Sequence, residues 1–267
     1  MGKQMARFCP LFSGSSGNCT YIGSASGGVL VDTGVSARRI ECALNEREID
    51  PRSIQAVFIT HEHTDHVSGL RVLAKRYGYK VYASAGTLDA LVEAQVLGTE
   101  NNFEVISEDG VETAGMYILP FHTSHDSRES LGYRVHTADG RTLAVATDTG
   151  CMTDAIRGAL VGCDLVLLES NHDIRMLENG PYPYVLKRRI LGERGHLSND
   201  CCAAELPFLA QNGTTRFVLG HLSRENNFPD LAYRTSRAVL DRTGLCEGKD
   251  YLLTVAPRSA DAPVMVL

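Results

Sequence analysis

The stretch "FITHEHTDHVSGL" (58–70) places four metal-binding side chains within six positions, at His61, His63, Asp65 and His66. Imidazole and carboxylate groups are ligands that zinc, manganese and iron(II) accept in proteins. His61 and His63 are two residues apart, so their side chains point the same way in an extended turn. Asp65 and His66 follow directly and can reach a second position nearby. The spacing therefore predicts a metal centre in this loop.

One loop does not complete the coordination of two metal ions, so further ligands must come from other parts of the chain. The remaining candidates are histidines and an aspartate, several of which follow apolar stretches. They are His122 and His125 in "LPFHTSHDS" (119–127), Asp148 in "VATDTG" (145–150), His221 in "FVLGHLS" (217–223), and His136, His172 and His196. The residues alone leave the choice among these candidates open.

Short apolar stretches alternate with amphipathic ones along the chain, and Gly and Ser separate many of them. The expected strands are 6–12, 19–23, 28–32, 54–60, 80–84, 103–106, 111–121, 131–137, 142–147, 164–169, 216–220 and 251–255. The expected helices are 36–48, 68–78, 86–97, 174–178, 184–192, 199–211 and 229–242. No linker or change of composition divides the sequence. The pattern predicts one domain, residues 1–267, of the α/β class, with helices covering the faces of the sheets.

The chain has 267 residues, a net charge of −6 and 43% hydrophobic residues, enough for a substantial core. It contains no run of about 18 apolar residues that could span a bilayer. The stretch "MGKQMARFCPLFSGSSGN" is too broken by glycine for a signal peptide. We therefore expect a soluble, cytoplasmic protein with no membrane partner. The eight cysteines form no C-x-x-C pair, so we expect them to be buried free thiols.

Two short patterns occur twice. "LVDTG" (30–34) and "VATDTG" (145–150) both end in Asp-Thr-Gly, which fits either a common turn or a fold with two similar halves. "GHLSND" (195–200) and "GHLSRENN" (220–227) share Gly-His-Leu-Ser, but their contexts differ. His221 follows an apolar strand, as a metal ligand would. His196 precedes a helix, where free backbone N–H groups favour phosphate.

The order of these motifs resembles the metallo-β-lactamase fold superfamily over roughly residues 6–235: H-x-H-x-D-H after a strand, a later His, an Asp at a strand end and a final His. More narrowly, "SGSSGN", "SHD", "TDTG", "ESNHD", "GHLSN" and "GHLSRENN" are similar to the YycJ (WalJ) family, whose members are described as DNA exonucleases. The resemblance implies an αββα sandwich with a two-metal site at one edge of the sheets.

Carried onto this sequence, the resemblance implies a ligand set for two divalent cations, zinc or manganese, with iron possible. The first ion would be held by His61, His63 and His125, the second by Asp65, His66 and His221, and both by Asp148. His125 is preferred to His122 because its Ser-His-Asp context matches the family.

The resemblance implies hydrolysis of DNA from 5′ to 3′. Two ions about 3.5–4 Å apart can share a hydroxide, which would attack phosphorus. Their charge would attract DNA despite the acidic chain. His196 is expected to protonate the leaving oxygen, and the predicted catalytic residues are Asp65 and His196.

Other residues are expected next to the substrate or behind the ligands. The predicted substrate-binding residues are Ser13, Ser15, Ser198, Asn199, Lys187 and Arg188. The resemblance implies that Asp32 braces the ligand loop, and His172 and Asn226 are also predicted to support the ligands.

Two other functions fit the same residues. The first is a hydrolase of this fold that acts on a small molecule, such as a cyclic phosphodiester, a thioester or a lactone. The second is a metal-binding regulatory module without catalysis, which would predict a lost ligand. The sequence leaves the oligomeric state open.

Overall fold

The computed structural model describes residues 5–24 and 26–267, which form two seven-stranded sheets. In spatial order the first sheet contains β14 (Met265–Val266), β1 (Arg7–Phe12), β2 (Cys19–Ser24), β3 (Gly27–Val31), β4 (Ile54–Phe58), β5 (Lys80–Ala83) and β6 (Phe103–Val105). The second contains β13 (Leu252–Val255), β12 (Arg216–Gly220), β11 (Leu165–Glu169), β10 (Thr142–Ala146), β9 (Leu131–Thr137), β8 (Met116–His122) and β7 (Val111–Thr113).

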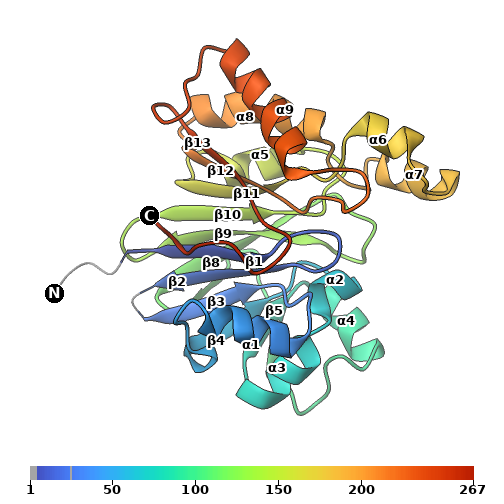
Figure 1. The fold of residues 1–267 in the computed structure, drawn as a ribbon. Coiled ribbons are helices and arrows are strands. Elements are labelled where there is room, and N and C mark those ends of the chain that lie inside the picture. The colour runs from blue at the N-terminus through green and yellow to red at the C-terminus, as the bar shows by residue number, and fades with distance from the viewer. Residues whose placement is uncertain (1–4, 25) are drawn as a thin grey trace.

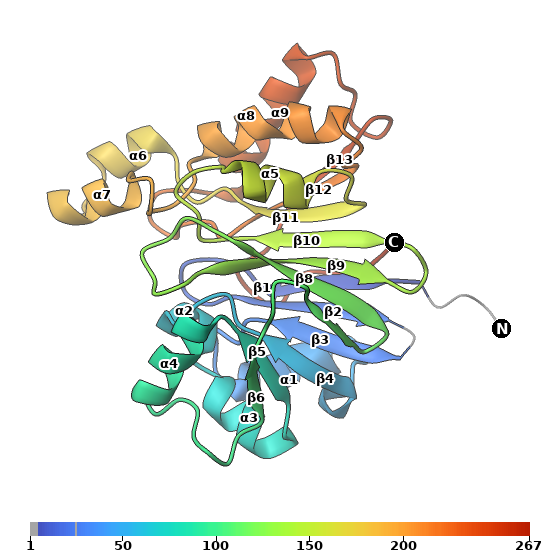
Figure 2. The ribbon, with the colours of Figure 1, turned by 180° about the vertical axis from the view of Figure 1, so that it is seen from behind.

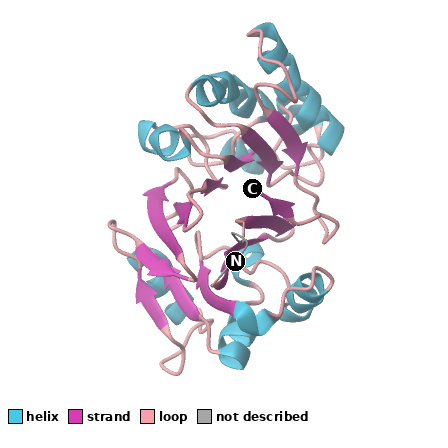
Figure 3. Ribbon diagram, turned by 90° about the vertical axis from the view of Figure 1, so that its left-hand side faces the viewer, coloured by secondary structure: helices cyan, strands magenta, loops and turns pink. Residues whose placement is uncertain are grey.

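Helices cover the outer faces of both sheets (Figure 1). On the first sheet they are α1 (Ala37–Asn45), α3 (Leu70–Tyr77) and α4 (Ala85–Glu93), with the short α2 (Thr64–Val67) nearby. On the second they are α5 (Asp154–Leu160), α8 (Asn199–Gln211) and α9 (Pro229–Arg242). A side view shows the same order of layers, with helices on both outer sides (Figure 3). The predicted αββα sandwich is confirmed.

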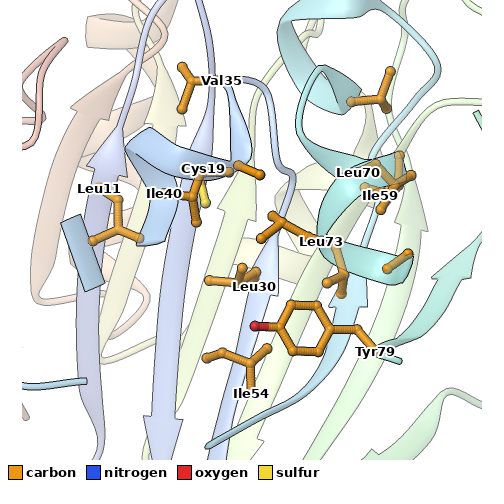
Figure 4. Packing of buried hydrophobic residues seen from close by; sticks show 14 of the residues in the cluster. Leu11, Cys19, Leu30, Val35, Ile40, Ile54, Ile59, Leu70, Leu73 and Tyr79 are labelled. Atoms are coloured by element: carbon orange, nitrogen blue, oxygen red, sulfur yellow. The ribbon is translucent and has the colours of Figure 1, made fainter. Parts of the chain in front are cut away.

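Three apolar clusters hold the layers together. Between the sheets, Phe8, Phe58 and Tyr133 belong to one cluster of buried side chains. Under the first sheet, Leu73 of α3 and Leu30 of β3 lie in a second cluster (Figure 4). The third cluster lies between the second sheet and the helices α5, α8 and α9. Alternate strand residues thus face different cores, which fixes the register of each sheet.

The two sheets repeat one strand pattern. In the first, β1, β2 and β3 are antiparallel, and β3 to β6 are parallel. In the second, β8, β9 and β10 are antiparallel, and β10 to β13 are parallel. The carboxyl ends of parallel strands share one edge of a sheet, where ligands bind in open α/β folds. Predicted site residues lie in the loops after β3, β4, β10, β11 and β12, and His125 lies in the loop after β8.

Several element predictions needed correction. The predicted strand 111–121 is a hairpin of β7 and β8, because Ala114 and Gly115 adopt positive φ angles of 52° and 66° and turn the chain. Helix α5 was not predicted, although Thr153 accepts a hydrogen bond at its N-terminus. Helix α2 and strand β14 were also missed, since both are too short to show a period.

The cysteine prediction is partly wrong. All eight thiols are free, as expected, but Cys42, Cys201 and Cys246 are exposed and Cys151 is half-buried. Exposed cysteines on helices contribute no periodic signal that distinguishes them from buried ones. Within the described residues, no helix has the length and apolarity needed to cross a membrane.

Leu30 tests the core that supports the site. It is fully buried in the central strand β3, whereas Leu252 is 48% exposed on the edge strand β13. We expect Leu30→Ala to lower the free energy of unfolding by about 2–5 kcal/mol, because it leaves a cavity among packed side chains. Urea titration followed by circular dichroism measures the change. Leu252→Ala is the matched control and should change stability by less than about 1 kcal/mol.

Candidate metal centre

The loop after β4 carries the first group of site residues. His61 is fully buried, and His63 stands just before the first turn of α2. Asp65 and His66 lie within that turn, and the His66 N–H donates to the carbonyl of His63. The short helix therefore turns His66 back toward His61, whose ring centroid lies 4.1 Å away.

The structure brings all seven predicted metal ligands together. Their possible ligand atoms fall into overlapping groups, in each of which every atom lies within 4.8 Å of the others. These groups are His61–His63–His125, Asp65–His66–His221 and His61–His66–Asp148, with a fourth, Asp148–Glu169–His196–His221, beside them. His125, and not the exposed His122, reaches the cluster, with its Nε2 atom 3.3 Å from Nδ1 of His63.

Three buried atoms of the cluster lack a hydrogen-bond partner. They are Nε2 of His61, Nε2 of His221 and Oδ2 of Asp148. A buried polar atom without a partner is costly, and such atoms commonly mark an ion or water site. Nitrogen lone pairs and a carboxylate oxygen facing one another are the donor set of a divalent cation. The residues present therefore fit metal ions.

Three buried histidines are held through Nδ1, which leaves their Nε2 atoms directed at the cluster. Nδ1 of His66 lies 2.7 Å from Oδ2 of Asp32, and Nδ1 of His125 lies 3.0 Å from the carbonyl of Gly195. Nδ1 of His61 lies 3.0 Å from the Thr60 hydroxyl, which donates to Asp32. Oxygen acceptors that face Nδ1 favour a proton on that nitrogen, so Nε2 is the atom available to bind a metal.

Glu169 at the end of β11 joins the two Gly-His-Leu-Ser segments. Its Oε1 atom lies 2.8 Å from Nδ1 of His196 and 2.7 Å from Nδ1 of His221. Its Oε2 atom accepts from the N–H groups of Thr149 and Leu197. One fully buried carboxylate thus orients both histidines. Glu169 was not among the predicted site residues, although it begins the "ESNHD" motif.

The electric field of the site favours positive charge. Burial disfavours charge on His221, but Asp148, Asp65 and Glu169 outweigh it and raise the pKa of this imidazole to about 10. Burial likewise opposes ionisation of Glu169, yet the neighbouring His196 and His221 hold the pKa of its carboxyl well below the usual range. At His61, burial and the adjacent His66 lower the pKa, so this imidazole is neutral and its lone pair is free.

The two Asp-Thr-Gly segments occupy matching places in the two sheets. Asp32 follows β3 and Asp148 follows β10, with φ angles of 61° and 55°. Each glycine permits a close backbone approach: a Cβ at Gly34 would lie 1.7 Å from the carbonyl oxygen of Asp65, and one at Gly150 2.4 Å from that of Glu193. The similarity therefore fits two similar halves, each of which packs a glycine against a site loop.

Four residues predicted near the substrate make internal bonds. Ser13 Oγ accepts from the His221 N–H at 2.8 Å and so supports a backbone with a φ of 54°. Ser198 caps α8 by accepting from the N–H of Cys201. Asn199 is buried between Ser170 and Asn227, so a substrate cannot reach it. Lys187 donates to the carbonyl of Glu178. Ser15 and Arg188 are exposed, as the prediction requires.

Among the predicted supporting residues, Asp32 contacts a ligand directly, as described above. His172 is buried, and this burial lowers its pKa to about 4; it lies outside the ligand groups. The Asn226 side chain reaches only Ser223, within its own turn. Asn171 does what Asn226 was predicted to do, because its amide donates to the carbonyl of His221 at 2.9 Å.

Glu169→Gln tests this arrangement. An amide carries no charge and cannot accept from both imidazoles as strongly, so we expect metal affinity to fall about 10–100-fold, the usual effect of removing a partner behind a ligand. Competition with a fluorescent chelator measures the affinity for zinc and manganese. Glu112→Gln, at an exposed position on β7, is the matched control. Equal affinities in the two variants would contradict the role given to Glu169.

Comparison with known proteins agrees with this geometry. Residues 28–222 match the model of the beta-lactamase superfamily domain. The exodeoxyribonuclease YycJ of Bacillus anthracis is 36% identical over 91% of this chain and 92% of its own length. The exodeoxyribonuclease WalJ of Streptococcus pneumoniae is 38% identical over 92% of both chains.

The fold also matches solved structures. The metallo-beta-lactamase fold protein YhfI of Bacillus subtilis superposes with a TM-score of 0.70 at 15% identity, covering 98% of this chain and 100% of the other. That likeness concerns the fold alone. The sequence matches go further: the chain belongs to the beta-lactamase superfamily, in the family of the YycJ and WalJ proteins.

Proposed function

We propose that this protein is a two-metal-dependent phosphodiesterase that removes nucleotides from the end of a DNA strand. The observation that carries the proposal is the convergence of seven His and Asp donors, three with buried, unpartnered atoms. The names of the YycJ and WalJ relatives support DNA as the substrate. The resemblance to this family supports 5′-to-3′ polarity.

The ligand groups support a division between two ions. His61, His63 and His125 would hold the first, and Asp65, His66 and His221 the second. Asp148 would serve both, since it lies 3.2 Å from Nε2 of His66 and 3.8 Å from Nε2 of His125. When bound, zinc or manganese, or iron in their place, would activate water and offset charge on the phosphate.

His196 is suited to donate a proton to the leaving oxygen. Its side chain is 19% exposed, whereas the ligands His61 and His221 are buried, and its Nδ1 atom is held by Glu169. Burial alone would lower its pKa, but Glu169 and Asp148 outweigh burial and raise the pKa of this imidazole above its ordinary value, which favours the protonated form. The ring therefore combines a fixed orientation with access to a bound substrate.

The direct test is an exonuclease assay on DNA and RNA labelled at the 5′ or the 3′ end, with zinc, manganese or magnesium added to metal-free protein. Release of labelled mononucleotides from 5′-labelled DNA at early times supports the proposal with its polarity. Early release of labelled mononucleotides from 3′-labelled DNA would show the opposite polarity. Hydrolysis of a small ester but of neither nucleic acid would point to a small-molecule hydrolase, and no hydrolysis at all to a regulatory module.

Replacing two ligands tests the metal dependence. We expect the double variant His61→Ala, His63→Ala to lose bound metal and to lose activity by at least about 1,000-fold, because two donors of one ion are gone. Elemental analysis and the end-label assay measure the two effects, and circular dichroism checks the fold. The control is His122→Ala, His136→Ala, outside the ligand groups. A fully active double variant at positions 61 and 63 would refute the two-metal reaction.

Replacing the proton donor separates catalysis from metal binding. We expect His196→Ala to keep its full metal content while kcat falls about 100-fold or more, the usual effect of removing a general acid. An activated substrate with a nitrophenolate leaving group should be much less affected, because this group leaves without a proton. A fall in metal content would instead make His196 a ligand, as its closeness to Asp148, Glu169 and His221 permits.

A further inference from the structure

Helices α6 (Ile174–Asn179) and α7 (Tyr184–Ile190) project from the body of the protein beyond the second sheet. Both views place them at the same end as α2, which carries site residues, and opposite the termini (Figures 1 and 2). No residue of α7 is buried. Packing against the core therefore does not explain the composition of this helix.

The surface of α7 combines apolar and basic side chains. Tyr184 and Val185 are 73% and 79% exposed, more than any other large apolar side chain in the described part of the chain. Residues 181–192 include Lys187, Arg188 and Arg189 but no Asp or Glu, although the whole chain has a net charge of −6. A basic segment with an exposed aromatic ring fits single-stranded nucleic acid, which offers phosphates and unpaired bases.

Arg188 and Tyr184 form a pair one helical turn apart. The guanidinium carbon lies 6.0 Å from the centroid of the ring, and the ring itself remains largely open to solvent. A base could stack on the ring while the guanidinium pairs with a neighbouring phosphate. Bases inside a duplex are already stacked and paired, so this geometry favours an unpaired strand.

Two arginines connect this segment to the candidate metal centre. Nη2 of Arg189 donates to Oδ1 of Asp126 at 3.0 Å, and the same oxygen lies 3.4 Å from Nε2 of His125. Arg194 donates to the carbonyl oxygen of His125 at 2.9 Å. The C-terminal turn of α7 therefore lies beside the loop that carries the proposed ligand His125.

We propose that α7 binds single-stranded DNA beyond the bond being cleaved, with Tyr184 stacked on a base and Arg188 paired with a phosphate. Arg189 is a positioning residue that holds α7 beside the His125 loop. This inference rests on the proposed exonuclease function and adds the part of the substrate that the enzyme recognises.

The test uses metal-loaded protein and the variants Tyr184→Ala, Tyr184→Phe and Arg188→Ala. Two controls, Tyr117→Ala and Arg52→Ala, change exposed residues of the same types elsewhere. KM and kcat are measured on a single-stranded oligonucleotide and on a blunt duplex. Hydrolysis of bis(p-nitrophenyl) phosphate, which has neither a base nor a second phosphate, reports separately on the metal centre.

We expect Tyr184→Ala to raise KM for the single strand about 10-fold with little change in kcat, because one base loses its stacking partner. Tyr184→Phe should restore the wild-type KM, since a phenyl ring also stacks. Arg188→Ala should raise KM. It should also reduce the dependence of KM on salt concentration by the amount expected for the loss of about one phosphate contact. The controls should match the wild type.

Unchanged KM in both alanine variants, with a wild type that degrades DNA, would overturn the inference while leaving the proposed function intact. An equal rise on single strands and blunt duplexes would overturn the preference for unpaired DNA, and failure of Tyr184→Phe to rescue would overturn stacking. A wild type that cleaves the small diester but no DNA would overturn both proposals together.

Discussion

The site depends on the anchoring of its histidines through a single ring nitrogen. In five of them, His61, His66, His125, His196 and His221, Nδ1 faces a hydroxyl, carbonyl or carboxylate oxygen. The other ring nitrogen is thereby fixed in direction and in protonation. An imidazole that could rotate or exchange tautomers would lose conformational entropy on binding a metal. Because these imidazoles are already fixed in the folded protein, that entropy is lost during folding and not during metal binding.

One anchor, Asp32, and two proposed ligands, Asp148 and His221, lie on strained backbone at the ends of strands. Asp32, Asp148 and His221 all have φ angles between 54° and 61°, which side chains with a Cβ rarely adopt. The backbone conformation of each such residue costs of order 1–3 kcal/mol of folding free energy. It is therefore found only where several surrounding contacts hold the backbone in place. At His221 these surroundings include Ser13 and Asn171, which hold its N–H and its carbonyl from two different loops.

Much of the fold and of the ligand set could be predicted from the sequence, because both leave local signals. Apolar strands show where the sheet edge lies, and ligand residues follow those strands directly. Glu169 was not predicted because a single carboxylate after a strand has no distinguishing sequence pattern. Its role depends on its contacts with His196 and His221, which are 27 and 52 residues away in the sequence. Asn199 was misjudged for a related reason: its position before a helix is visible in sequence, but its burial is not.

The division of the ligands between the two halves of the fold has a mechanical consequence. His61, His63, Asp65 and His66 belong to the half with the first sheet, whereas His125, Asp148 and His221 belong to the half with the second. Neither half alone holds enough donors for two ions. A cation bound at the shared edge would therefore link the two sheets. The two halves could then separate only if the metal were released at the same time. Resistance to unfolding would then depend on metal supply as well as on the apolar core.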